Sequence, residues 1–216
     1  MKNVLFDFDS TLIKEESLEL ILAPLLQDNK NKLLEIEKIT NLGMQGSIGF
    51  RESLESRLAI ASPTKDSIQD FIDAHCPSIL TDGMQSLIDE LHKNGTNVWI
   101  FSGGLADSIR PFADVLNIPR ENVFAVEVNW NPKGSFKSLD NTNGACDSKL
   151  IAFENVKSLF SGEVIAVGDG YTDYKLKEGG YADKFIAYTE HVQRDNVIQK
   201  AELIAKDIYE LTNFVL

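Results

Sequence analysis

The sequence predicts an α/β fold, in which a doubly wound parallel sheet carries an inserted helical cap. Two observations predict the sheet: short apolar runs rich in β-forming residues recur along the 216 residues, and stretches with a helical period separate most of them. A third observation predicts the cap. The first two apolar runs lie much farther apart in the chain than one crossover helix requires.

Five apolar runs are the expected strands. They are NVLFDFD (3–9), NVWIFSGG (97–104), NVFAVEV (122–128), EVIAVGDG (163–170) and DKFIAY (183–188). Near-continuous apolar strands are typical of a parallel sheet that helices cover on both faces. The segment WNPKGSF (130–136) predicts a hairpin turn after the third of these strands.

Helical periodicity marks the connections between strands. In DGMQSLIDELHKNG (82–95) the apolar residues recur at helical spacing, and Gly95 can end the helix. The segment KLIAFENVKSLF (149–160) shows the same spacing before the fourth expected strand. Each helix therefore serves as a crossover between parallel strands.

The long insertion reads as entirely helical, with prolines between its segments. Leucines and isoleucines recur at intervals of three and four in segments near 15–28, 30–45, 47–60 and 64–75. The expected domains are an α/β core formed by residues 1–14 and 79–216, and a helical cap formed by residues 15–78.

The composition limits the binding partners and the cellular compartment that we expect for this protein. The formal net charge of −12 argues against nucleic acid or an anionic membrane surface as a partner. The longest apolar stretch, residues 18–26, is interrupted by Glu19 and Pro24, and the N-terminus lacks a secretory signal pattern. Two cysteines, Cys76 and Cys146, without metal-ligand spacing predict reduced thiols, so we expect a cytoplasmic protein.

Polar motifs follow three of the expected strands. The first strand ends in Asp7-x-Asp9-Ser10-Thr11, the second in Ser102-Gly103-Gly104, and the fourth in Gly168-Asp169-Gly170-x-x-Asp173. Ligands of open parallel sheets bind beyond the carboxyl ends of the strands, and right-handed crossovers bring these ends to one edge. Each motif also occurs in ordinary turns, but three together predict one functional site.

Electrostatics predicts what this site binds. Four ionised aspartates carry a charge of −4, and the nearest cation by sequence context, Lys149, leaves −3. A phosphate monoester would then be repelled, because two unit charges 4 Å apart interact by about 4 kcal/mol at an effective dielectric of 20. Carboxylate oxygens are ligands of hard divalent cations. We therefore expect Mg²⁺ to bridge Asp7, Asp169 and a substrate phosphate.

With these motifs and the cap segment MQGSIGFRESLESR (44–57), the chain resembles haloacid-dehalogenase-superfamily phosphatases, and among them the phosphoserine phosphatase family. The resemblance covers nearly the whole chain and implies the Rossmann-like core of that superfamily. It also implies a Mg²⁺-dependent phosphomonoesterase that hydrolyses O-phospho-L-serine to L-serine and phosphate through an aspartyl phosphate. The implied partner is therefore a small-molecule phosphomonoester.

The resemblance assigns roles to the core residues. It implies that Asp7 is the nucleophile, that Asp9 is the general acid and base, and that Lys149 neutralises charge in the transition state and binds phosphate. Ser102 and Gly103 are implied to hold phosphate oxygens.

The same resemblance implies a metal site. The implied ligands of Mg²⁺ are Asp7, the carbonyl oxygen of Asp9, and Asp169. Thr172 and Asp173 are implied to surround and orient these ligands without binding the metal themselves.

Substrate selection is expected from the cap. On a helix near 47–60, Arg57 falls within the apolar stripe, and an inward arginine requires an anion, which a substrate carboxylate or a cap glutamate can supply. The resemblance implies that Arg57 binds the substrate carboxylate and that Glu16 binds its ammonium group. It further implies that Met44, Gly46 and Phe50 line the substrate pocket.

Two alternative functions stay open at this level, besides a catalytically silent ligand-binding relative, against which the intact set of acidic residues argues. One keeps the chemistry but changes the substrate to phosphoethanolamine, phosphothreonine or a sugar phosphate, or transfers the phosphoryl group to homoserine. The other is a phospho-receiver signalling domain, against which the helical insertion and Asp9 argue, because a general acid and base promotes hydrolysis of the phosphoaspartate. The oligomeric state is left undetermined.

Overall fold

The computed structural model describes residues 1–44 and 47–216, and it confirms the predicted doubly wound sheet. Seven strands form one sheet in the order β4-β3-β2-β1-β5-β6-β7. Their bounds are β1 (Lys2–Phe6), β2 (Asn97–Leu105), β3 (Val123–Trp130), β4 (Phe136–Asp140), β5 (Glu163–Gly168), β6 (Lys184–Tyr188) and β7 (Leu203–Ala205). All the expected apolar runs form strands.

Strand β1 occupies the centre of the sheet. Val4 pairs with Val98 of β2 on one side and with Ile165 of β5 on the other, both in parallel register. The strand order reverses at β1, so its carboxyl end is the crevice in which such sheets bind their ligands. Only β4 among the described strands runs antiparallel, because the predicted turn after β3 returns the chain along the edge.

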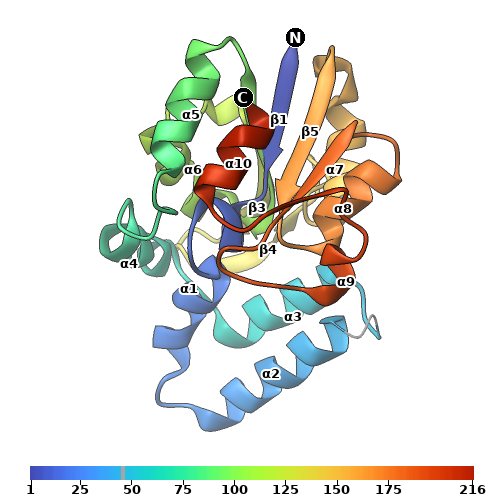
Figure 1. The fold of residues 1–216 in the computed structure, drawn as a ribbon. Coiled ribbons are helices and arrows are strands. Elements are labelled where there is room, and N and C mark those ends of the chain that lie inside the picture. The colour runs from blue at the N-terminus through green and yellow to red at the C-terminus, as the bar shows by residue number, and fades with distance from the viewer. Residues whose placement is uncertain (45–46) are drawn as a thin grey trace.

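Helices cover both faces of the sheet, as predicted (Figure 1). One face carries α5 (Met84–Lys93), α6 (Ala106–Val115) and α10 (Ile208–Val215), and the other carries α7 (Lys149–Val156) and α8 (Tyr171–Glu178). Alternate β1 residues point to opposite faces, so Phe6 packs with the first group and Leu5 with the second. Short α9 (Asp195–Ile198) follows β6.

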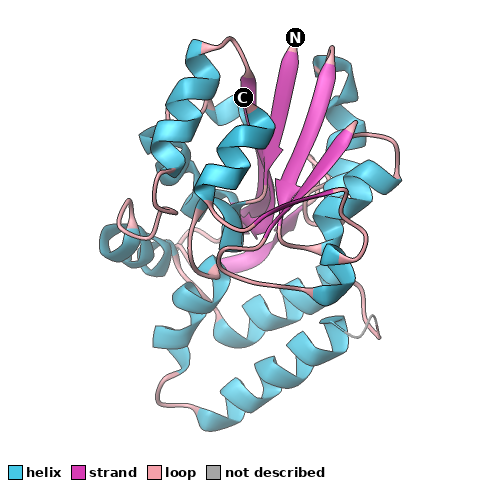
Figure 2. Cartoon of the chain, in the orientation of Figure 1, coloured by secondary structure: helices cyan, strands magenta, loops and turns pink. Residues whose placement is uncertain are grey.

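The predicted helical insertion is confirmed as four helices between β1 and α5 (Figure 2). They are α1 (Ser17–Leu26), α2 (Lys30–Met44), α3 (Phe50–Ala61) and α4 (Lys65–His75). Thr64 begins α4 with a capping box, because its hydroxyl accepts from the Ser67 N–H and the Ser67 hydroxyl accepts from the Thr64 N–H. Helices α1–α3 lie beyond the carboxyl ends of the strands, towards which β1 and β5 point (Figure 1).

Main-chain hydrogen bonds join the segment after the C-terminal end of α3 to the sheet. The Phe136 N–H donates to the Pro63 carbonyl over 2.9 Å, and the Lys65 N–H donates to the Gly134 carbonyl over 2.8 Å. These bonds join the α3–α4 connection to the β3–β4 hairpin. Helix α4 also packs against α6, with the ring centroids of Phe71 and Phe112 6.1 Å apart.

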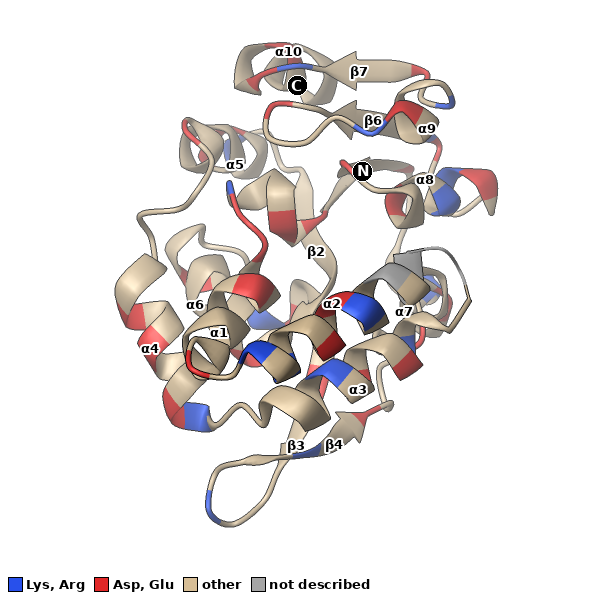
Figure 3. Ribbon diagram, turned by 90° about the horizontal axis from the view of Figure 1, so that it is seen from below, with Lys and Arg blue, Asp and Glu red and all other residues tan. Residues whose placement is uncertain are grey.

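The outer surface carries charges of both signs. Seen from the cap side, basic and acidic residues alternate along α2 and α3 (Figure 3). Within residues 1–44 and 47–216, no helix has the length and apolarity needed to cross a membrane.

Candidate active site

Nine of the predicted site residues line one cavity of about 570 Å³ between the carboxyl ends of the strands and the cap helices. They are Asp7, Asp9, Glu16, Phe50, Arg57, Gly103, Lys149, Asp169 and Thr172. Two others, Ser102 and Asp173, are buried and hydrogen-bond to residues that line the cavity. The structure thus brings together motifs that lie far apart in the sequence.

Asp7 is placed by the end of the central strand. Its N–H continues the β1–β5 ladder by donating to the Val167 carbonyl over 2.9 Å, so the side chain leaves at the sheet edge. The oxygen Oδ1 accepts from the Phe8 N–H over 2.7 Å. A tight turn, η1 (Phe8–Leu12), follows, and Ser10 adopts a positive φ of 52° within it.

Lys149 lies between two carboxylates. Its Nζ is 2.7 Å from Asp7 Oδ1 and 2.6 Å from Asp173 Oδ1, so it is a cation in direct contact with the acidic motifs. Burial alone would lower the pKa of Lys149, but the Coulomb attraction of Asp173 and Asp7 outweighs burial and raises this pKa. Lys149 is therefore a permanent positive charge in the site.

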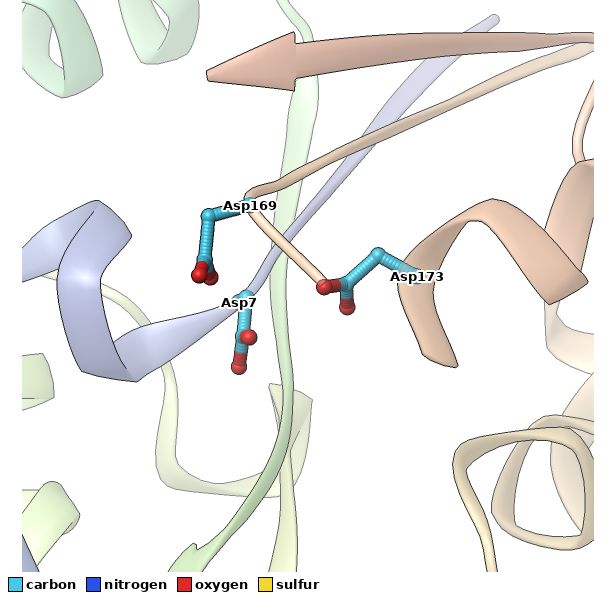
Figure 4. A group of neighbouring side chains, drawn as sticks. All are labelled: Asp7, Asp169 and Asp173. Atoms are coloured by element: carbon cyan, nitrogen blue, oxygen red, sulfur yellow. The ribbon is translucent and has the colours of Figure 1, made fainter. Parts of the chain in front are cut away.

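Asp7, Asp169 and Asp173 form an acidic cluster, shown in Figure 4. One carboxylate oxygen of each lies within 4.8 Å of the others, and opposite ligands of Mg²⁺ are about 4.2 Å apart. Burial, followed by repulsion from Asp7, raises the pKa of Asp169 and that of Asp173. The cluster therefore contains more negative charge than its neighbours compensate, and hard oxygen donors in this arrangement fit a divalent cation such as Mg²⁺.

Asp173 is the most constrained member of this cluster. Oδ1 pairs with Lys149, and Oδ2 accepts from the Gly170 N–H over 3.1 Å. With both oxygens engaged, the carboxylate is suited to orient its neighbours.

The last residues of β2, where its register with β3 shifts, present main chain to the cavity. The buried Ser102 hydroxyl accepts from the Gly104 N–H over 2.9 Å, which holds this segment in shape. Gly103 lies under the ring of Phe50, and a Cβ at this position would lie 2.9 Å from Phe50 Cζ. A side chain at position 103 would therefore make the Phe50 ring of the cap helix α3 move.

Asp9 combines a buried carboxyl with an acidic neighbour. Oδ1 accepts from the Ser17 N–H over 2.7 Å. Burial, then repulsion from Glu16, raises the pKa of Asp9 to about 7. A carboxyl that changes protonation near neutral pH can both give and take a proton.

Arg57 points inward, as its place in the apolar stripe predicted. Its side chain is 12% exposed and lines the cavity. Nη1 lies 3.9 Å from Glu19 Oε1, and Nε donates to the Ser53 carbonyl over 3.3 Å. Burial lowers the pKa of Arg57, and the opposing effect of Glu19 and Glu16 is smaller. The loose pair with Glu19 leaves guanidinium donors for a ligand carboxylate.

The other predicted cap residues differ in what the structure describes. Glu16 accepts from the Ser10 hydroxyl over 2.8 Å and faces the cavity. Phe50 is 40% exposed, so a large aromatic ring lies open on the inner side of the cap. The Met44 side chain and Gly46 lie outside the described residues.

Arg194 is a cavity residue that the sequence reasoning missed. It follows β6, and its Nε donates to Asp169 Oδ2 over 2.9 Å while its Nη2 lies 3.9 Å from Glu16 Oε1. A second cation therefore joins Lys149, and the charge of four ionised aspartates with both cations is −2. The strand-end rule applied to β6 would have directed attention to this loop.

Comparisons with known proteins agree with this geometry. Residues 4–178 match the model of haloacid dehalogenase-like hydrolases. The rat and human proteins named phosphoserine phosphatase are each 32% identical over 216 residues, covering 96% of this chain and 90% of theirs. The crystal structure of a phosphoserine phosphohydrolase-like protein from Francisella tularensis subsp. tularensis SCHU S4 matches with a TM-score of 0.93 and 63% identity, covering both chains fully.

The chain therefore belongs to the haloacid dehalogenase-like hydrolase family, and it is a phosphatase. Within this family it belongs with the phosphoserine phosphatases, as the motifs at the strand ends and in the cap indicated. Membership of a hydrolase family with an intact acid set excludes the phospho-receiver alternative.

Proposed function

We propose that this phosphatase hydrolyses O-phospho-L-serine to L-serine and phosphate, with Mg²⁺ as cofactor and Asp7 as the covalent nucleophile. The observation that carries the proposal is the position of Arg57, an inward and loosely paired guanidinium in the same cavity as Asp7 and Lys149. A phosphorylated amino acid supplies both the phosphate and the carboxylate that these groups require. The names of the curated relatives support the same substrate.

In this proposal the phosphoryl group is transferred twice. An Asp7 oxygen attacks phosphorus, the bond from phosphorus to the serine oxygen breaks, and Asp9 protonates that oxygen as serine leaves. Water then attacks the phosphoaspartate and gives its proton to Asp9, the Asp7–phosphorus bond breaks, and phosphate leaves. Asp9 ends as it began, protonated for the next cycle.

The other residues bind and orient the substrate. Oδ1 of Asp7 is held by the Phe8 N–H and by Lys149, so Oδ2 is the oxygen available for attack. Ser102 and the Gly103 main chain hold phosphate oxygens beside Lys149. Asp7, Asp169 and the Asp9 carbonyl would hold Mg²⁺, and Asp173 and Thr172 would support these ligands. The bound cation would supply the positive charge that a dianionic phosphate requires here.

The cap residues select the amino acid. Arg57 binds the substrate carboxylate, and Glu16 binds the ammonium group. Phe50 closes the pocket around the small side chain. We place this reaction in the cytoplasm.

The proposal is tested by measuring phosphate release from phosphorylated amino acids, amino alcohols and sugars, with and without a chelator. We expect L-phosphoserine to give the highest kcat/KM and the chelator to abolish release. The Arg57→Ala variant should raise KM for phosphoserine by about 30-fold or more, because the substrate carboxylate loses a partly buried charged partner. For a generic aryl phosphate its KM should change less than about twofold.

Arg120→Ala is the matched control, because it removes an arginine that pairs with Asp114 on the exposed surface. Equal effects of Arg57→Ala on both substrates would contradict the amino-acid assignment. If a sugar phosphate or phosphoethanolamine gave the highest kcat/KM, the substrate assignment would be wrong but the phosphatase chemistry would stand. Full turnover in the presence of chelator would contradict the metal dependence.

A further inference from the structure

An ion pair links the first turn of α3 to the core next to the cavity. Arg51 Nη1 lies 3.1 Å from Asp147 Oδ1, and the two side chains are 39% and 32% exposed. Arg51 belongs to the cap segment, whereas Asp147 belongs to the loop before α7 and lines the cavity. Neither residue takes part in the proposed transfer of the phosphoryl group.

The two ends of α3 are held in different ways. Beyond its last turn, main-chain hydrogen bonds join Pro63 and Lys65 to the β3–β4 hairpin. At its first turn, side chains make the contacts described here: the Phe50 ring on Gly103, and the Arg51–Asp147 pair. Main-chain hydrogen bonds thus fix the chain after the last turn of α3, whereas the contacts of the first turn described here are made by side chains.

Asp147 is rigidly connected to the catalytic lysine. The N–H groups of Asp147 and Ser148 both donate to the Gly144 carbonyl over 3.1 Å. The Ser148 hydroxyl caps α7 by accepting from the Ile151 N–H over 3.1 Å, and Lys149 is the first residue of that helix. A displacement of Asp147 would therefore also displace the turn that positions Lys149.

We propose that Arg51 and Asp147 are positioning residues, whose ion pair holds the first turn of α3 closed over the cavity. Closure keeps the Phe50 ring against the phosphate-binding main chain at Gly103 and fixes the cap relative to the Lys149 turn. The pair thus raises the fraction of molecules in which cap and core sides of the site are assembled. The inference requires a phosphomonoester substrate but not phosphoserine in particular.

The expected size of the effect follows from the exposure of the pair. A half-exposed ion pair supports a change of about two- to fivefold in a closing equilibrium. Because binding is linked to closure, we expect Arg51→Ala and Asp147→Ala each to raise KM by about this factor. The kcat values should stay within about twofold, because the bound substrate still reaches Asp7 and Lys149.

The experiment compares four variants with the phosphomonoester that wild type turns over fastest. They are Arg51→Ala, Asp147→Ala, the double alanine variant, and the charge exchange Arg51→Asp with Asp147→Arg. The double alanine variant should match the singles, since either change already breaks the pair. The charge exchange should restore KM to within about twofold of wild type. The matched control, Arg120→Ala, should leave KM unchanged.

Two further measurements separate positioning from a general loss of stability. Backbone hydrogen exchange over residues 47–56 should be faster in both single variants and slow again in the charge exchange. Raising the salt concentration should bring the KM of wild type and Arg51→Ala together, because salt screens the exposed pair. If the charge exchange does not fold, this convergence in salt remains a decisive measurement.

Unchanged KM and unchanged exchange in both single variants would overturn the inference. Additive effects of the two alanine changes would also overturn it, because they would show that the residues act separately. A collapse of kcat with unchanged KM would assign the pair to placement of Lys149 alone and would contradict cap closure.

Discussion

At the scale of single residues, the site depends on carboxyl groups with different surroundings. Asp7 has an oxygen bound by Lys149, whereas the Asp9 carboxyl is buried beside Glu16. Burial disfavours the charged form of Asp9, and its pKa rises to about 7, while Asp7 has a cation in contact. Two aspartates one residue apart can therefore serve as nucleophile and as general acid.

The protonation of Asp9 predicts a pH dependence for the first transfer step. The protonated form donates to the leaving oxygen, and its fraction falls as pH rises through about 7. The rate of phosphoaspartate formation, measured in single turnovers by rapid quench, should therefore fall tenfold per pH unit on the alkaline side. Below pH about 7, the rate of phosphoaspartate formation should not depend on pH.

Asp9→Asn is the variant that checks this assignment. The alkaline limb should disappear and the first step should slow by about 100-fold or more for an alkyl phosphate. An aryl phosphate, whose leaving group needs little protonation, should slow far less. An unchanged alkaline limb in Asp9→Asn would show that another group titrates there.

Residues at strand ends were predictable because apolar runs mark where strands stop. Asp7 and Asp169 were named at strand ends and Lys149 at the start of the helix before β5, and the structure places the three together. Arg194 and Asp147 were not named. Each lies in a loop whose local sequence has no periodicity, so only the folded chain brings Arg194 to Asp169 and Asp147 to the cap.

At the scale of elements, the contact between α3 and the last residues of β2 controls how closely the cap approaches the core. A methyl group at Gly103 would lie 2.9 Å from the Phe50 ring, closer than carbon atoms pack. The tip of a half-exposed ring can move away, so Gly103→Ala should leave stability nearly unchanged. Moving the ring displaces the cap, and we expect KM to rise by about tenfold.

Removing the ring tests this explanation. Phe50→Ala should raise KM by itself, and adding Gly103→Ala to it should raise KM little further, because the clash is gone. Gly49→Ala is the matched control, since a Cβ there meets nothing within 4 Å. Steady-state kinetics and thermal unfolding of the four variants measure both quantities. A large further loss in the double variant would place the effect in the phosphate-binding main chain itself.

Helical periodicity predicted the cap helices, whereas α6 and α10 were not named from the sequence although they hold ten and eight residues. The four cap helices each hold ten or more residues, and all were expected. Strand β7 has three residues and α9 has four, too few for a period of 2 or 3.6 to appear. Their positions depend on packing beside β6, a tertiary effect that the local sequence does not contain.

At the scale of the whole molecule, the doubly wound topology concentrates negative charge at one point. Strands β1 and β5 are neighbours in the sheet, and an aspartate follows each, so Asp7 and Asp169 converge although 162 positions separate them (Figure 4). The chain as a whole is also acidic, at −12. The folded state therefore includes a repulsive centre whose repulsion a bound divalent cation would reduce.

This arrangement predicts that Mg²⁺ stabilises the whole fold. A ligand that binds only the folded state at 100 times its Kd stabilises by about 2.7 kcal/mol. For a chain of this size, each kcal/mol shifts Tm by about 2–4 °C, so saturating Mg²⁺ should raise Tm by about 5–10 °C over the chelated protein. Thermal unfolding followed by circular dichroism, at matched ionic strength, measures the shift without any substrate.

The location of the effect is checked with two variants of equal charge change. Asp169→Asn removes one anionic oxygen of the cluster, and the Mg²⁺-dependent rise should shrink to about 1–2 °C or less, because a neutral amide is a weaker ligand of a hard cation. Asp70→Asn removes an exposed acid on α4 and should keep the full rise. If both variants keep it, Mg²⁺ acts on the acidic surface in general and the cluster is not its site.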